Sequence, residues 1–202
     1  MARLTVTNNV TLDGVMQAPG RPDEDRRGGF EYGGWAQPYN DPVMGKVMGE
    51  RMGQGGSLLF GRRTYEDFAD VWPKMPQPNP FTKILTDTPK YVASTTLAEP
   101  LPWANSTLLK GDVKDAVAKL KTDEQKDIVI LGSGELIKTL MEADLIDAFV
   151  LSIHPLVLGT GRHLFSDGVS LARFRLTDST PTTTGVIIAT YERTDPDAIP
   201  TA

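Results

Sequence analysis

The stretch Ile128-Val-Ile-Leu-Gly-Ser-Gly-Glu-Leu-Ile137 carries the clearest structural signal in this chain of 202 residues. Its four apolar residues, Ile128–Leu131, are typical of a strand that is buried on both faces. Gly132 and Gly134 end that strand, and the segment Gly134–Glu142 then predicts a helix. A buried strand that turns directly into a helix is the unit of an α/β fold with parallel strands.

Strand-like and helix-like segments alternate along the rest of the chain. Asp41 and Pro42 suit the N-cap and first position of a helix, and Thr64 with Asp67 has the spacing of a capping box. Two segments of alternating polarity near the end predict a closing antiparallel pair. We therefore expect one domain spanning residues 1–202, an α/β sandwich with a mixed sheet. The other predicted strands are 4–10, 57–60, 90–93, 106–109 and 149–153, the helices 42–52, 64–69 and 112–121, and the antiparallel pair 172–178 and 185–191.

Three stretches do not fit this alternation. Residues 17–35 hold too many glycines and prolines for a helix or a central strand. A loop of this length within a compact domain is usually functional. Residues 72–80 read as a connector stiffened by prolines, and residues 195–202 as a frayed end.

Composition excludes several classes of function. Lys and Arg number 21 against 26 Asp and Glu, a net charge of -5, which argues against a nucleic-acid binder. The chain has no Cys and only two His, so thiol chemistry and a zinc site are not expected. It begins without the apolar stretch of a signal peptide, and it contains no apolar run of the roughly 18 residues that cross a membrane. We expect a cytoplasmic protein without a metal.

Three loops that follow predicted strands suit phosphate groups. Gly61-Arg62-Arg63-Thr64 precedes a helix, whose N-terminal N–H groups and dipole attract anions. Gly132-Ser133-Gly134 would let the backbone approach a pyrophosphate closely, and Ser94-Thr95-Thr96 offers hydroxyl groups. Taken alone, each loop is better explained as an ordinary turn. Because parallel strands end at one edge of a sheet, the three loops together predict a dinucleotide site.

Three other residues are candidates for contact with a substrate. Asp13 follows the first strand and fits either an acid facing a cleft or a turn residue. Asp41 could carry a proton, or serve only as the helix cap. Trp35 could stack on a planar substrate or anchor the long loop, and His154 is better explained as a structural residue. The chain has no nucleophile elbow and no P-loop, so nothing indicates a hydrolase or an NTPase.

The motifs taken in order resemble the dihydrofolate reductase-like family, in particular the reductase (C-terminal) domain of the bacterial riboflavin-biosynthesis deaminase/reductase. No single motif is decisive, but their order is specific, and the resemblance covers the chain from about Leu4 to Tyr191. It rests on residues 11–14 (TLDG), 58–66 (LLFGRRTYE), 90–97 (KYVASTTL), 131–136 (LGSGEL), 145–147 (LID) and 154–165 (HPLVLGTGRHLF).

The resemblance implies a three-layer α/β/α fold with a mostly parallel sheet, and NADPH as hydride donor. In dihydrofolate reductases the equivalents of residues 61–64 and 132–134 meet the cofactor phosphates, and those of 94–96 lie near the adenosine 2′-phosphate. The substrate implied is a small heteroaromatic, pteridine-like or ribosylaminopyrimidine-like compound, 5-amino-6-(5-phosphoribosylamino)uracil among them. Related reductase domains pair two-fold, so a homodimer is also implied.

Within this reading, Asp13 is the first candidate for substrate contact and proton supply, and Asp41 is the second. Trp35 would form a wall of the pocket. The carboxylate that dihydrofolate reductases carry shortly after a tryptophan matches Asp41 only with a one-residue shift. Two alternatives therefore stay open, a dihydrofolate reductase proper and a non-catalytic NADPH-binding protein.

Overall fold

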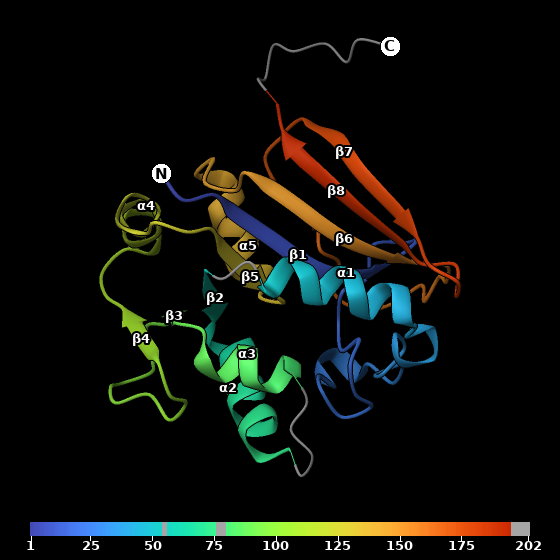
Figure 1. Cartoon of the computed structure of the whole chain (residues 1–202), viewed down its shortest axis with the longest axis horizontal. Helices are drawn as coiled ribbons and strands as arrows, with labels where there is room; N and C mark the ends of the chain where they lie inside the picture. The colour runs from blue at the N-terminus through green and yellow to red at the C-terminus, as the bar shows by residue number, and fades with distance from the viewer. Residues whose placement is uncertain (54–55, 76–79, 195–202) are drawn as a thin grey trace.

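The computed structural model of the chain describes residues 1–53, 56–75 and 80–194, with a mixed sheet of eight strands at its centre (Figure 1). The order across the sheet is β4-β3-β2-β5-β1-β6-β8-β7. The six strands from β4 to β6 are parallel, whereas β8 is antiparallel to β6 and β7 to β8. The mixed, mostly parallel sheet is thus confirmed. The strands are β1 (Leu4–Thr11), β2 (Ser57–Gly61), β3 (Lys90–Ala93), β4 (Ser106–Leu109), β5 (Ile128–Leu131), β6 (Ala148–His154), β7 (Phe174–Pro181) and β8 (Ile187–Arg193).

Helices cover both faces of the sheet, as a three-layer fold requires. Because side chains alternate along a strand, Leu59 packs in the core under α4 and α5, while Leu58 and Phe60 pack on the opposite face. That opposite core includes Tyr65 of α2 and Leu85 of α3. The helices are α1 (Pro42–Gly53), α2 (Arg62–Val71), α3 (Pro80–Asp87), α4 (Val113–Asp123) and α5 (Gly134–Glu142).

The start of α2 differs from the prediction. The strand β2 continues to Gly61, and α2 begins at Arg62 with Gly61 as its N-cap and without a side-chain cap. The capping box of Thr64 and Asp67 is therefore wrong, because Thr64 already lies inside the first turn. Its hydroxyl is instead used by the neighbouring turn at Ser133.

The region after α2 holds a helix that the sequence did not predict. A 3-10 helix, η3 (Trp72–Lys74), follows α2, and α3 begins at Pro80. Pro is tolerated in the first turn of a helix, so a proline-rich stretch can directly precede one. Part of the predicted proline connector, residues 76–79, and the whole predicted frayed end, residues 195–202, lie outside the described residues.

The long loop after β1 is confirmed, and it has a small core of its own. It contains only two 3-10 turns, η1 (Arg27–Gly29) and η2 (Gln37–Tyr39). Phe30 and Trp35 are buried together with Val15 of the same region. The indole Nε1 of Trp35 donates to the carbonyl of Gln17 at 2.7 Å. The loop is therefore held in one conformation by packing among its own residues and against the segment after β6, despite its many glycines and prolines.

Candidate functional site

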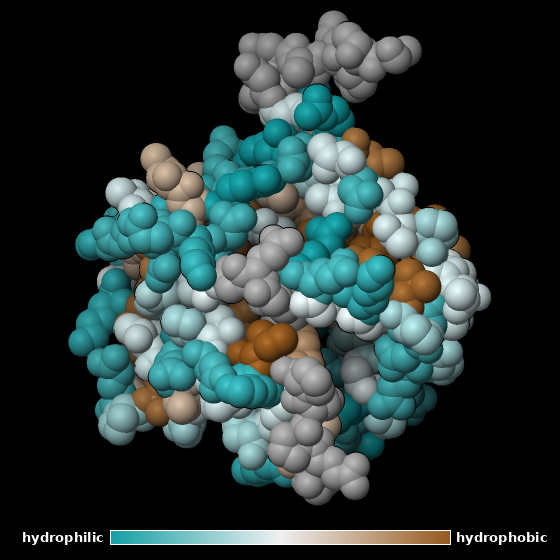
Figure 2. Space-filling view, viewed as in Figure 1, coloured by the Kyte–Doolittle hydropathy of each residue, from teal (hydrophilic) through white to brown (hydrophobic). Residues whose placement is uncertain are grey.

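The three predicted phosphate loops line a single cleft of about 1840 Å³ at the carboxyl ends of β2, β3 and β5. Figure 2 shows a hollow on this face, which lies between the α2–α3 region and the long loop, drawn in blue in Figure 1. The structure thus brings all ten predicted cofactor residues around one space. These are Gly61, Arg62, Arg63, Thr64, Ser94, Thr95, Thr96, Gly132, Ser133 and Gly134.

Two of the loops are joined directly by hydrogen bonds. The backbone N–H of Ser133 donates to Oγ1 of Thr64 at 3.0 Å. In return, the N–H of Gly61 donates to Oγ of Ser133 at 2.9 Å. The N-termini of α2 and α5 therefore lie next to each other at the cleft. Because the first N–H groups of a helix have no partner inside it, this is an arrangement that attracts anions.

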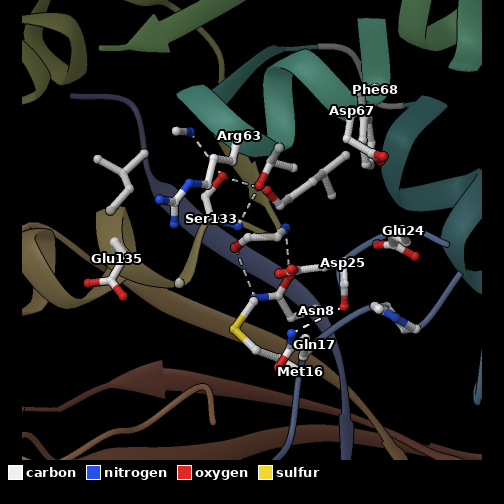
Figure 3. Close-up of a pocket in the computed structure, with 18 of the residues that line it drawn as sticks. Asn8, Met16, Gln17, Glu24, Asp25, Arg63, Asp67, Phe68, Ser133 and Glu135 are labelled. Carbon is white, nitrogen blue, oxygen red and sulfur yellow. Dashed lines mark hydrogen bonds between the residues drawn. The ribbon is translucent and has the colours of Figure 1, made fainter. Parts of the chain in front are cut away.

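The two adjacent arginines of α2 have different surroundings. Arg62 pairs with Glu66 one turn along the helix, at 2.9 Å. Arg63 has no ion-pair partner within the part of the chain that the structure describes, and it lines the cleft. Figure 3 shows Arg63, Ser133 and Glu135 at one end of the cleft. An unpaired guanidinium beside two helix N-termini suits a phosphate ligand.

The third loop forms a hydroxyl-stabilised turn. Oγ of Ser94 accepts the N–H groups of Thr96 at 3.1 Å and of Leu97 at 3.0 Å. This is the turn that the sequence left open as an alternative. Thr95 and Thr96 nevertheless line the cleft, so the turn and a ligand contact are compatible.

The opposite end of the cleft is largely apolar. In Figure 3 Asp67, Phe68 and Glu24 lie at this end, away from Arg63. Asp67 is paired with Arg21 at 2.5 Å, which links α2 to the long loop. The apolar side chains here come from three helices and a 3-10 turn. They are Met44, Met48, Phe68, Val71, Trp72 and Phe81.

Glu24 is the carboxyl group at this end that lacks a cationic partner, and it was not among the residues predicted from the sequence. Its Oε2 accepts the N–H groups of Gly20 at 2.6 Å and of Arg21 at 3.0 Å. Within the described part of the chain, Oε1 has no hydrogen-bond partner. Burial raises the pKa of Glu24, although the two N–H groups act in the opposite direction. Glu24 sits among other acids in a loop, so no pattern distinguished it.

Asp13 lies away from the cleft lining and has structural partners. Its carboxylate accepts the hydroxyl of Thr11 at 2.5 Å and the N–H of Gly159 at 2.8 Å. The Thr11 hydroxyl, with the backbone N–H groups, lowers the pKa of Asp13. The side chain therefore joins the turn after β1 to the loop after β6. A catalytic role for Asp13 stays a prediction that this geometry does not support.

Asp41 is the helix cap that the sequence indicated. Oδ1 accepts the N–H of Met44 at 2.8 Å, and Oδ2 accepts the N–H and hydroxyl of Thr183 at 2.7 and 2.8 Å. These bonds, that from Met44 first, lower the pKa of Asp41. With both oxygens engaged and no part in the cleft lining, Asp41 has no geometry that favours proton transfer to a substrate.

Trp35 anchors the loop and does not line the cleft. Its ring meets that of His154 edge to face, with centroids 5.1 Å apart. His154 is fully buried, and its Nε2 bonds Asn9 Oδ1 at 3.0 Å. Burial lowers the pKa of His154 to about 4, so the ring is neutral and structural.

Two structural features are absent from the described residues. In residues 1–53, 56–75 and 80–194, no group of three or more acidic or His side chains is placed to hold a metal ion. Over the same ranges, no helix is long and apolar enough to cross a membrane.

The three layers, the sheet order and the cleft at the carboxyl ends of the strands define an α/β protein of the dihydrofolate reductase-like fold. Comparison with known families then places the chain more narrowly. It belongs to the RibD C-terminal domain family, whose model matches residues 2–188. The family resemblance expected from the sequence motifs is thereby confirmed.

Individual relatives agree with this placement. The protein is 31% identical over 193 residues to the uncharacterized protein YyaP of Bacillus subtilis, covering 94% of both chains. Among solved structures, a protein from Shewanella sp. PV-4 with a provisional riboflavin-biosynthesis name has a TM-score of 0.71 at 25% identity, covering 96% of this chain and 100% of the other. Dihydrofolate reductase from Enterococcus faecalis, complexed with NADP(H), has a TM-score of 0.59 at 16% identity, covering 96% and 97%.

Proposed function

We propose that the protein is an NADPH-dependent reductase of a small planar heteroaromatic compound. The observation that carries this proposal is the cleft itself, whose two ends differ in chemistry. One end joins two helix N-termini to the unpaired Arg63, and the other is apolar with the carboxyl of Glu24. A phosphate-rich cofactor and a flat, mostly apolar substrate are the two ligands that such a cleft suits.

The residues present fit the cofactor. N–H groups at the starts of α2 and α5 and the guanidinium of Arg63 would hold its phosphates, and residues 94–96 would contact its adenosine end. When bound, the cofactor supplies a hydride. The protein then contributes chiefly by holding the substrate at reacting distance from the nicotinamide ring, which can lower a barrier by about 7–11 kcal/mol.

The apolar end of the cleft would take the substrate. Met44, Met48 and Phe68 would exclude water and pack against a flat ring. Met side chains adapt to irregular shapes, so this surface tolerates several related compounds. Hydride delivery leaves negative charge on a nitrogen or oxygen atom, which must receive a proton or a hydrogen bond.

Glu24 is the carboxyl best placed to hold that proton. Its Oε1 is available to a ligand while Oε2 is fixed by two backbone N–H groups. Burial raises its pKa, so at a given pH more of this carboxyl is protonated than of an exposed glutamate. We therefore propose Glu24, in place of Asp13 and Asp41, as the acid that contacts the substrate.

A spectrophotometric screen of NADPH oxidation tests the proposal. The panel includes dihydrofolate, other pterins, flavin precursors, 5-amino-6-(5-phosphoribosylamino)uracil and small carbonyl compounds. Turnover of one of them, with measurable NADPH binding in calorimetry, supports a reductase. Turnover of dihydrofolate above all others would identify a dihydrofolate reductase proper. Tight NADPH binding without any turnover would favour the non-catalytic alternative, and absence of NADPH binding would overturn the proposal.

A further inference from the structure

The turn after β5 is held by a side chain from the neighbouring strand β1. The N–H of Gly132 donates to Oδ1 of Asn8 at 2.7 Å, and Nδ2 of Asn8 donates to the carbonyl of Gly132 at 3.2 Å. Asn8 is buried in the central strand of the sheet. An amide placed there gives up its bonds to water, and the two bonds to Gly132 replace them.

The turn that Asn8 holds has an uncommon backbone. Gly132 and Ser133 have successive left-handed φ angles of +58° and +61°. Such a conformation is costly for Ser and persists only where the surroundings enforce it. Ser133 is constrained through its bonds to Thr64 and Gly61, and its hydroxyl donates to the carbonyl of Leu131 at 2.9 Å. Asn8 applies the corresponding constraint to Gly132.

These bonds determine which N–H groups remain for a ligand. The N–H of Gly132 is used by Asn8, and that of Ser133 by Thr64. The next two residues, Gly134 and Glu135, begin α5, and their N–H groups have no acceptor within the helix. A phosphate at this turn must therefore bind to the N–H groups at the start of α5. The position of these groups is set by the residues before them.

We propose that Asn8 is a positioning residue for the pyrophosphate of the cofactor. It acts through Gly132, by fixing the turn from which α5 begins, and it touches no reacting atom. This inference rests on the proposed function, since it names the residue that organises the same cofactor site. It concerns the pyrophosphate alone, and the adenosine end near residues 94–96 is not involved.

The experiment measures ligand binding by calorimetry, without reliance on turnover. Substitution of Gly132 would be a poor test, because an added Cβ would lie 2.9 Å from Cγ2 of Thr64. Asn8→Leu removes both hydrogen bonds at similar volume, and Asn8→Ala removes them with a smaller uncharged side chain. The matched control is Asn105→Gly, which removes an amide that donates to the carbonyls of Thr86 and Asp87 outside the cleft and suits the φ of +58° at this position.

Each variant is titrated with NADPH and with adenosine 2′-monophosphate, which has the 2′-phosphate but no pyrophosphate. Both Asn8 variants should bind NADPH about tenfold more weakly or worse, the scale of one lost charge-assisted hydrogen bond. Their affinity for adenosine 2′-monophosphate should match that of the wild type. The Asn105 variant should bind both ligands normally. Should Asn8→Leu fail to fold by circular dichroism, the uncharged Asn8→Ala carries the same criterion.

The outcomes separate this inference from the proposed function. Normal NADPH affinity in the Asn8 variants, with binding by the wild type, overturns the role of Asn8 alone. Equal weakening of NADPH and adenosine 2′-monophosphate also overturns it, because the damage would not be confined to the pyrophosphate. A wild-type protein that binds no NADPH overturns the proposed function and this inference with it.

Discussion

The rings of Trp35 and His154 meet nearly at right angles, 89° between planes, so that the long loop packs on the last residue of β6. Tyr39, four residues further along the same loop, packs on the same imidazole, with centroids 5.4 Å apart. Nε2 of His154 donates to Asn9, and in the described part of the chain its buried Nδ1 has no partner. Protonation of Nδ1 would place a charged N–H where no acceptor lies.

This contact predicts a loss of stability in acid. Burial lowers the pKa of His154 from 6.5 to about 4. Between those values the unfolded chain takes up a proton that the folded protein does not. The contribution of His154 is complete above pH 6.5 and declines as the pH falls to about 4, by up to about 3 kcal/mol. Urea unfolding of the wild type and of His154→Gln across this range measures it. Equal pH slopes for the two proteins would contradict the prediction.

The cofactor preference is expected to depend on Arg63. A charge-assisted contact to a phosphate is worth about 1.5–3 kcal/mol, which predicts at least about a tenfold preference for NADPH over NADH. Arg63→Ala should reduce that preference. Arg62→Ala is the matched control, and it should have a smaller effect because Arg62 already pairs with Glu66. Equal affinities of the wild type for NADPH and NADH, in calorimetric titration, would show that the cleft does not select the extra phosphate.

The two carboxyl candidates can be separated by paired substitutions. Glu24→Gln should lower kcat by about 10²-fold, the usual scale of general acid catalysis, and leave NADPH affinity unchanged. Asp13→Asn should lower the melting temperature by several degrees, because its carboxylate holds Thr11 and Gly159, and should change kcat little. Steady-state rates with an identified substrate, together with thermal melts, check both. An active Glu24 variant and an inactive Asp13 variant would reverse the assignment.

A homodimer is expected through the C-terminal strands. β7 is an edge strand, and exposed apolar residues lie along this end of the sheet, with Leu171 84%, Leu176 50% and Ile187 46% exposed. Such an edge invites pairing with a second copy. Light scattering should give twice the 22.0 kDa of one chain. Leu176→Lys should yield the monomer, whereas Leu12→Lys, at a residue 64% exposed beyond β1, should not. A monomeric wild type at micromolar concentration would refute the dimer.

The parts of the fold with strong periodicity were predictable from sequence. The strands Lys90–Ala93 and Ile128–Leu131 have the predicted bounds, because Ser94 and Gly132 mark where the two strands end. The helix α3 was missed, because prolines around its start disguised it. The capping box at Thr64 failed because the cap of α2 is set by where β2 ends. Local spacing does not contain that information.

The site was predictable on the cofactor side and less so on the substrate side. Loops after parallel strands must meet at one edge, so Gly61, Ser94 and Gly132 could be grouped without a structure. Asn8 and Glu24 reach the cleft through tertiary packing, and neither lies in a recognisable motif. Asp13 and Asp41 looked equally suitable in sequence. Only their hydrogen bonds to distant residues, Gly159 and Thr183, reveal what they do.

The central place of β1 has a consequence for how the molecule is made. β1 precedes every other strand along the chain, yet its partners are β5 and β6, in the registers Leu4↔Ile128 and Thr5↔Ala148. During synthesis this strand, most of which is buried in the finished fold, must therefore wait, unpaired, until most of the polypeptide has left the ribosome. Contacts so distant in sequence slow folding and leave nascent intermediates open to aggregation. The cleft, which needs Asn8 and Gly132 together, is consequently completed late in biogenesis, so a ligand that binds there can stabilise only the nearly finished chain.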